Sequence, residues 1–183
     1  PTEDEQNFYA QIMNLLNPRL GDQQPDFADT TAPIDVSGEQ PGGEITVDTH
    51  WVLQGDVTLK QQLELKQNVD FTIDLNGYVL YVQDDQWFAL LDNYTNSSLT
   101  ILDSNPTKAH YGVMDTNNKW TYYEVKPDDY ATEVLGGIIT GKGNTGNWGG
   151  AICMGTNVTL NMHGGTIANF TAAQGGAIRN SGT

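Results

Sequence analysis

Paired carboxylates are the residues of this chain that come nearest to an acid–base catalytic pattern. Asp84-Asp85 and Asp128-Asp129 are such pairs, and two carboxylates at a suitable separation can hydrolyse a glycosidic bond. Adjacent residues of a strand point to opposite faces of a sheet, so neither pair alone brings two carboxylates together. Asp is also common in turns, because its side chain bonds the local backbone. We therefore interpret both pairs as turn residues and predict no catalytic residue.

Metal and thiol chemistry has no better support in the residue spacing. His50, His110 and His163 are scattered and form neither an HExxH motif nor a Cys/His cluster. Cys153 is the only cysteine, so no intrachain disulfide can form, and we interpret it as a small strand residue rather than a nucleophile. We predict no metal site and no cofactor, and leave open whether an acidic turn binds Ca²⁺.

Aromatic residues offer a stronger candidate site, since Tyr and Trp supply large, stiff, partly polar contact area at recognition surfaces. They gather between Leu102 and Gly137, where the chain carries more residues than its repeat pattern needs. Insertions in repeat proteins often form the binding face. The alternative is a core role, and alternation along a strand lets only one of Tyr122 and Tyr123 point inward. The predicted binding residues are Tyr111, Trp120, Tyr122, Tyr123 and Tyr130 in this segment, and Trp148 beyond it.

Short repeats predict the elements that position these residues. Three sets of fragments recur with nearly the same period, about 27 residues, and such self-similarity is typical of a solenoid. The apolar positions in each fragment alternate, which favours short strands. The fragments are GGII from residue 136 and GGTI from 164, GGAI from 149 and again from 175, and FTI from 71, LTI from 99 and VTL from 158.

We expect each repeat to supply three strands, so that residues 45–183 form an all-β domain, a parallel β-helix of about five coils. The first predicted face takes residues 71–75, 99–102, 133–135 and 158–162, the second takes 78–82, 112–114, 137–140 and 165–168, and the third takes 88–91, 121–125, 151–154 and 177–180. On the first face, the expected inward columns are Phe71, Leu99 and Val158, and then Ile73, Ile101 and Leu160.

The first 44 residues differ from the rest. Thr2 and Glu5 fit a capping box, and apolar residues follow at helical spacing, so residues 3–17 are predicted to form an α-helix. We expect this helix to cap the N-terminal end of the solenoid, with the Pro-rich residues 18–44 as a linker. At the other end the pattern stops within a strand, so we expect a truncated β-helix, a monomeric part of a longer chain.

The charge of the chain restricts its partners. Asp and Glu outnumber Lys and Arg by 23 to 8, for a formal net charge of −15. Phosphate binding needs Lys and Arg, so nucleic acid and anionic membrane surfaces are unsuitable partners. No apolar run approaches the length of about 18 residues that a membrane span requires, so we expect no membrane insertion. The composition suits a soluble extracellular surface.

Several sequence segments resemble the repeats of a known family. They are GGIITG, GGAICMG, VTLNMHGGTI and GGAIRNSGT. From about residue 45 to 183 the chain resembles the right-handed parallel β-helix repeats of large secreted or wall-attached surface proteins of gut Firmicutes. The resemblance implies a right-handed coil, a bacterial cell-surface or secreted location, and adhesion. In some members it implies capture of host proteins such as immunoglobulins. The function expected from it is non-catalytic binding of a host protein.

Two alternatives stay open. Polysaccharide lyases and hydrolases are built on a similar solenoid, so a glycan-active enzyme or a glycan-binding module is the second reading. Lyases of this type use a Ca²⁺ cluster of aspartates with an Arg base, and here the two arginines are Arg19 and Arg179, one in the linker and one near the end. The third reading is a passive stalk segment of a long adhesin.

Overall fold

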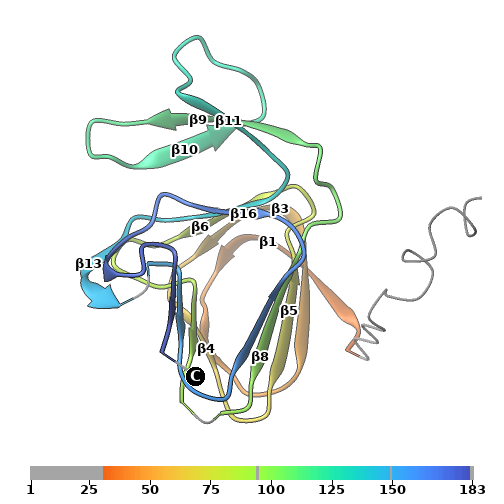
Figure 1. Ribbon diagram of the computed structural model, residues 1–183. Coiled ribbons are helices and arrows are strands. Elements are labelled where there is room, and N and C mark those ends of the chain that lie inside the picture. The colour runs from red at the N-terminus through yellow and green to blue at the C-terminus, as the bar shows by residue number, and fades with distance from the viewer. Residues whose placement is uncertain (1–30, 94, 149, 182–183) are drawn as a thin grey trace, which may run out of the picture. The chain divides into compact units, whose positions relative to one another are not determined.

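The structure, a computed structural model, describes residues 31–93, 95–148 and 150–181, with segment 143–148 described by its backbone alone. These residues form strands and no helix, and most of the strand pairs are parallel (Figure 1). The arrangement is all-β and compatible with a β-helix-like fold. The helix predicted over residues 3–17 lies outside the described residues.

The largest sheet has eight strands, and all of its pairs are parallel. They are β1 Pro33–Gln40, β3 Thr49–Leu59, β5 Asp70–Asp74, β6 Val79–Val82, β8 Ser98–Leu102, β12 Ile138–Thr140, β15 Thr159–Met162 and β16 Thr166–Ala168. The order is β15-β8-β5-β3-β6-β12-β16, and β1 also pairs with β3. Strand β3 pairs with β5 through its first residues and with β6 through its last, so the predicted first and second faces join into one curled sheet.

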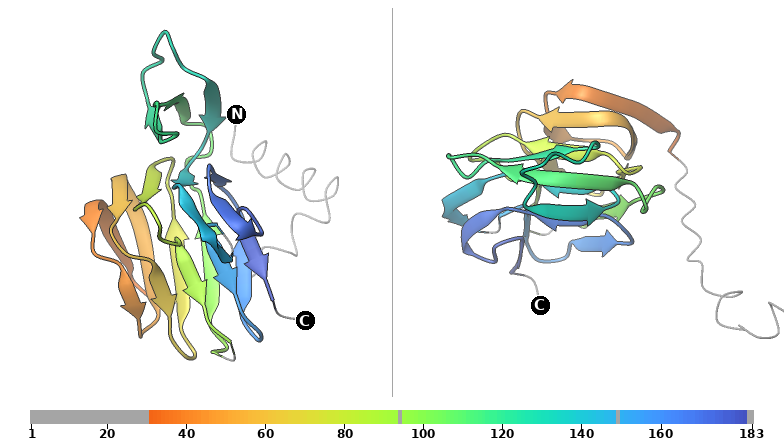
Figure 2. Two further views of the ribbon diagram at one scale, coloured as in Figure 1. Left: turned by 90° about the vertical axis from the view of Figure 1, so that its left-hand side faces the viewer. Right: turned by 90° about the horizontal axis from the view of Figure 1, so that it is seen from above.

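Two further parallel sheets complete this part of the fold, which we call the body. The five-stranded sheet has the order β18-β14-β7-β4-β2, and β13 pairs with β17. The strands are β2 Gly43–Ile45, β4 Leu63–Leu65, β7 Ala89–Leu91, β13 Gly143–Trp148, β14 Ile152–Met154, β17 Thr171–Gln174 and β18 Ile178–Asn180. Figure 2 shows the strands of the body stacked side by side, with the chain progressing from β1 at one end to β18 at the other.

The core lies between the large sheet and the five-stranded sheet. Alternate residues of β5 and β8 point into it, and Phe71, Ile73, Leu99 and Ile101 are all fully buried. Burial of one such side chain contributes about 1.5–3 kcal/mol relative to exposure. The edge-to-face contact of Trp51 with Phe71, at 5.3 Å between ring centroids, adds a specific geometry to this burial.

Each predicted column is correct for two of its three members. Phe71 lies beside Leu99, and Ile73 beside Ile101. On the second face β6, β12 and β16 pair in register, and on the third face β7, β14 and β18 do the same. Repeated apolar triplets therefore identified strands that stack directly on one another.

One strand of each predicted face was wrong. Residues 112–114, 121–125 and 133–135 do not join the parallel sheets. They contribute instead to a separate antiparallel sheet of three strands, in the order β10-β9-β11. Its strands are β9 Ala109–Met114, β10 Trp120–Tyr123 and β11 Thr132–Leu135. Strands of both kinds alternate with the same period, so alternation alone does not distinguish them.

Two smaller predictions also need correction. Leu160 lies beside Leu99 and Met162 beside Ile101, so β15 is shifted by two residues from the predicted register. Val158 precedes the strand, just after Asn157, which has φ of 58°. The segment 18–44, predicted as a linker, contains strand β1, which begins at Pro33 and pairs along β3. Proline is tolerated at this first position of an edge strand.

Candidate functional site

A segment of the chain leaves the body, folds as the antiparallel sheet and returns (Figures 1 and 2). We call residues 109–135 the insertion. Its two ends lie side by side, because the N–H of Gly136 donates to the carbonyl of Lys108 at 2.8 Å. Asp103 fixes the neighbouring backbone, accepting hydrogen bonds at 2.8 Å from the N–H groups of Gly77 and Gly137. The insertion therefore leaves and rejoins the body at neighbouring residues.

A tight turn forms the hairpin of β9 and β10. The N–H of Asp115 donates to the carbonyl of Lys119 at 2.9 Å, and the Asp115 carboxylate accepts from the N–H groups of Asn117 and Lys119. Asn118 takes the left-handed conformation, with φ of 60°, which Asn tolerates better than most residues. Strand β11 then pairs with the other edge of β9, so the insertion presents two faces.

The inner face packs on the body through Tyr122. This side chain is 5 % exposed and packs with Val79 and Ile138 of the large sheet. Its backbone N–H donates to the hydroxyl of Tyr81 at 2.9 Å, and its own hydroxyl accepts from Asn169 Nδ2 at 2.8 Å. Burial raises the pKa of Tyr81 to about 12 and also raises the pKa of Tyr122, so both phenols stay protonated at neutral pH.

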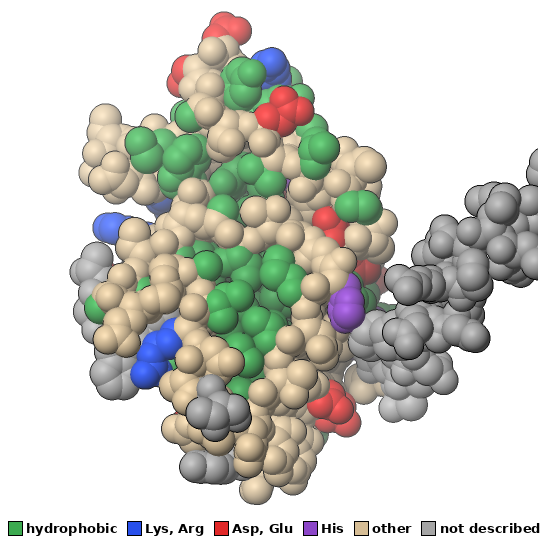
Figure 3. All heavy atoms as spheres, viewed as in Figure 1, with side chains coloured by type: hydrophobic (Ala, Val, Ile, Leu, Met, Phe, Trp, Pro, Cys, Tyr) green, Lys and Arg blue, Asp and Glu red, His purple; other side chains and the backbone are tan. Residues whose placement is uncertain are grey.

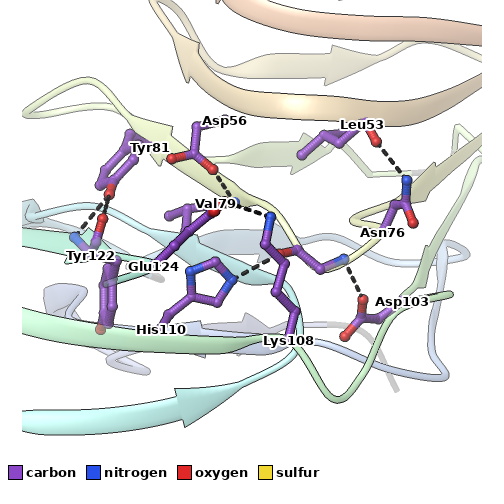
Figure 4. A network of polar contacts seen from close by, with 11 residues as sticks. Leu53, Asp56, Asn76, Val79, Tyr81, Asp103, Lys108, His110, Tyr122 and Glu124 are labelled. Carbon is purple, nitrogen blue, oxygen red and sulfur yellow. Dashed lines mark hydrogen bonds and ion pairs between the residues drawn. The ribbon is translucent and has the colours of Figure 1, made fainter. Parts of the chain in front are cut away.

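Polar contacts extend this inner interface (Figure 4). His110 is 1 % exposed, and its Nε2 lies 2.7 Å from the carbonyl oxygen of Gly77. Lys108 Nζ lies 2.7 Å from a carboxylate oxygen of Glu124 and 3.6 Å from the ring centroid of Tyr78. The hydrogen bond and charge of Lys108 lower the pKa of Glu124. These contacts fix the orientation of the insertion at its junction with the body.

The outer face carries three tyrosines, of which Tyr123 is exposed and Tyr111 and Tyr130 are half-buried. Tyr123 pairs across strands with Tyr111 and is 47 % exposed. Tyr111 and Tyr130 meet edge to face at 5.5 Å, and Lys126 Nζ lies 4.4 Å from the centroid of Tyr130. Hydrogen bonding to Tyr130 raises the pKa of Lys126. We call this set, with the exposed Leu135, the outer patch. Figure 3 shows hydrophobic side chains beside charged ones at the top of the view, where the insertion lies.

A cavity of about 580 Å³ lies between the hairpin and the body. Trp120 and Tyr122 of β10 line one side, and residues of β3 and β6 line the other. Charged side chains of both signs reach it, with lysines more numerous than carboxylates. The charged lining residues are Lys60, Lys119, Lys142, Asp56 and Asp84, and the polar ones include Thr58, Gln83, Asn118, Thr121 and Thr140.

The predicted aromatic residues thus divide between two faces. Trp120 and Tyr122 point inward, and their rings stack at 6.3 Å between centroids. Tyr111, Tyr123 and Tyr130 belong to the outer patch. Of the adjacent pair, Tyr122 is the buried residue and Tyr123 the exposed one. Trp148 belongs to β13, where the side chains lie outside the description.

The sequence interpretation missed the lysines of the cavity. Lys60 follows β3, Lys119 ends the hairpin turn, and Lys142 follows β12. No local motif joins positions so far apart, and only the fold brings them together. Both Asp pairs lie in turns, as predicted. Asp85, which follows β6, has φ of 65°. Within the described part of the chain, no group of three or more His, Cys, Asp or Glu side chains is placed to hold a metal ion.

None of the described residues belongs to a helix long and apolar enough to cross a membrane.

Comparisons with known proteins do not identify this site. No protein-family model matches the chain, and neither a curated protein nor a solved structure matches it.

Proposed function

We propose that this chain is a non-catalytic binding module that recognises another protein through the outer patch. The observation that carries the proposal is the grouping of Tyr111, Tyr123 and Tyr130 on a sheet face turned away from the body, with Tyr123 at 47 % exposed. Tyrosine offers wide contact area with only two side-chain torsions to order, so it contributes strongly at interfaces. Lys126 beside Tyr130 adds a charge at the border of the patch.

The partner proposed is a host protein, with an immunoglobulin as the first candidate. This choice comes from the resemblance to surface proteins of gut Firmicutes, and it brings with it a secreted or cell-surface bacterial location. The net charge of −15 supports a protein partner over nucleic acid. The fold proposed in detail is a right-handed parallel β-helix of about five coils, with residues 3–17 as a capping helix. The in-register parallel pairs of the body support the stacked part of this proposal.

Binding is favoured over catalysis by the carboxylates of the cavity. Asp56 already accepts a hydrogen bond from the N–H of Val79 at 3.0 Å, which is a structural role. Asp84 precedes the turn at Asp85 and is exposed. Acid–base hydrolysis needs two carboxylates placed on either side of one glycosidic bond. The Asp56 carboxylate instead holds the backbone of β6 through the N–H of Val79.

The test uses purified human immunoglobulins and the full chain in biolayer interferometry. The double variant Tyr111→Ser/Tyr123→Ser removes the outer patch, and we expect its affinity to fall by at least about tenfold. The matched control is Ile34→Ser/Val47→Ser, which removes exposed apolar side chains from the body, where they are 50 % and 67 % exposed. This control should bind like the parent.

Circular dichroism checks that both variants stay folded. If the parent binds no immunoglobulin, mass spectrometry of proteins captured from mucosal secretions extends the search to other host proteins. Protein recognition by this surface is refuted if no host protein is retained, or if the patch variant retains the same protein as well as the parent.

A further inference from the structure

We propose that the cavity between the hairpin and the body binds a short saccharide that carries a single negative charge. This site is separate from the outer patch, because its lining comes from the inner face of the insertion and from the large sheet. Its volume of about 580 Å³ falls within the range of small-molecule sites, about 300–1,000 Å³.

The distribution of lysine points to an anion. The chain has 8 Lys and Arg residues against 23 Asp and Glu residues, yet Lys60, Lys119 and Lys142 all line this one cavity. Lys60 is paired with Glu39 at 2.7 Å. Within the described residues no carboxylate lies at ion-pair distance from Lys119 or Lys142. These two lysines belong to different walls of the cavity, the hairpin turn and the loop after β12, so both walls offer a positive charge to a bound anion.

The other lining groups distinguish a saccharide from a bare anion. Asp56 and Asp84 line the same cavity, and carboxylates need hydrogen-bond donors, which sugar hydroxyls supply and a sulfate ion does not. Thr58 adds a hydroxyl from β3 of the large sheet. The half-buried ring of Trp120 forms an apolar wall, and the C–H face of a sugar ring suits such a wall.

Charge also limits the length of the ligand. The net charge of −15 repels a long polyanion that extends beyond the cavity over the acidic surface. A short ligand lies within a few ångströms of the lysines, and its interaction with more distant charges is screened beyond about 8 Å at physiological salt. One carboxylate or one sulfate on a di- or trisaccharide fits both conditions.

The experiment titrates the full chain with sialyllactose, sulfated lactose and lactose, monitored by NMR. We expect both charged sugars to bind at least about tenfold more tightly than lactose, and the stronger of the two identifies the anionic group. Binding should weaken as salt is raised. Inorganic sulfate serves as a fourth probe and should bind more weakly than either charged sugar.

Variants locate the site. Lys119→Gln/Lys142→Gln should reduce the affinity for the charged sugar by at least about tenfold. Lys126→Gln makes the same change on the outer face and should leave it unaltered, as should Tyr111→Ser/Tyr123→Ser. Both cavity lysines are exposed, so the fold should persist, and circular dichroism verifies this. The proposal is overturned if neither charged sugar binds, if lactose or inorganic sulfate binds equally well, or if the cavity variant retains full affinity.

Discussion

The body and the insertion are stabilised in different ways. In the body, successive strands bring fully buried side chains such as Phe71, Leu99 and Ile152 into one continuous core. In the insertion, the buried cluster consists of Tyr122 together with Val79 and Ile138, and the latter two belong to the body. The insertion therefore depends on the body for its core, whereas the body has a core of its own.

The two parts also differ in how much of their stability comes from buried apolar packing. A stack of strands tolerates little change in its inward residues, because each one packs on residues of the neighbouring strands. The insertion is held by a few specific contacts, such as those of Tyr122 with Tyr81 and Asn169. Regions with few buried apolar contacts open at lower free energy than the core. The outer patch lies on the insertion, and the cavity lies between the insertion and the body.

The substitution with the largest expected effect disrupts the core of the body. Ile73→Asp places a charge among fully buried apolar side chains, and an unpaired buried charge costs more than the typical stability of about 5–15 kcal/mol unless it is neutralised. We expect loss of cooperative unfolding in urea, followed by circular dichroism. The control Ile73→Val should cost only about 1 kcal/mol. A soluble Ile73→Asp variant with the parent midpoint would show that the core does not depend on this column.

A smaller change should loosen the insertion and leave the body intact. A Cβ atom on Gly112 would lie 2.9 Å from side-chain atoms of Tyr122 and Thr132 and 3.1 Å from Trp120. Gly112→Val should therefore cost about 1–3 kcal/mol through overpacking. Hydrogen exchange should accelerate in β9, β10 and β11 but not in β5 and β8. Equal acceleration in both regions would mean that the two parts unfold together.

High pH should affect the interface between the insertion and the body more than the core of the body. Burial raises the pKa of Tyr81 from 10.0 to about 12, so its contribution is fully present below pH 10 and is lost as the pH rises towards 12. We expect tryptophan fluorescence to report loosening of the insertion over this range, while the far-ultraviolet signal of the body persists.

Tyr81→Phe is the matched variant for that transition. It removes the hydroxyl that accepts from the N–H of Tyr122, and we expect a loss of about 1 kcal/mol at neutral pH. The alkaline transition should become smaller, because only Tyr122 still resists ionisation there. If the alkaline transition is unchanged in Tyr81→Phe, groups other than the Tyr81 hydroxyl cause it.

The smallest effect concerns the charged junction. Lys108→Met removes the contacts to Glu124 and to the ring of Tyr78, which together should contribute about 1 kcal/mol or less. Lys108 lowers the pKa of Glu124, so the pair stabilises above the ordinary carboxyl pKa and this contribution fades as the pH falls through the lowered value. NMR titration should show the pKa of Glu124 rising in Lys108→Met. No rise would mean that the ion pair is not maintained in solution.

Much of the body could be predicted because its strands repeat. The apolar triplets at Phe71 and Leu99 stack in the expected register. The register at Leu160 was wrong by two residues, and a shift of two keeps the same side chains inward, so alternation cannot detect it. The antiparallel strands were not predicted, because their alternation has the same period as that of the parallel strands and only the turn from Asp115 to Lys119 distinguishes the hairpin.

The candidate site was only partly predictable. The aromatic cluster was located from its place between repeats, and alternation correctly required Tyr122 and Tyr123 to face opposite sides. The cavity could not be found in this way, because Lys60, Lys119 and Lys142 are distant in sequence and surrounded by no shared motif. Their convergence is a property of the tertiary structure alone.

The adjacency of Lys108 and Gly136 has a consequence for how such proteins diversify. Because the insertion starts and finishes at hydrogen-bonded neighbours, a different segment of almost any length could be grafted between them without altering the register of the stack. Asp103 would continue to clamp Gly77 and Gly137 on either side of the graft. The stack therefore determines where such a segment starts and ends, and its own strand pairs do not depend on the length of that segment.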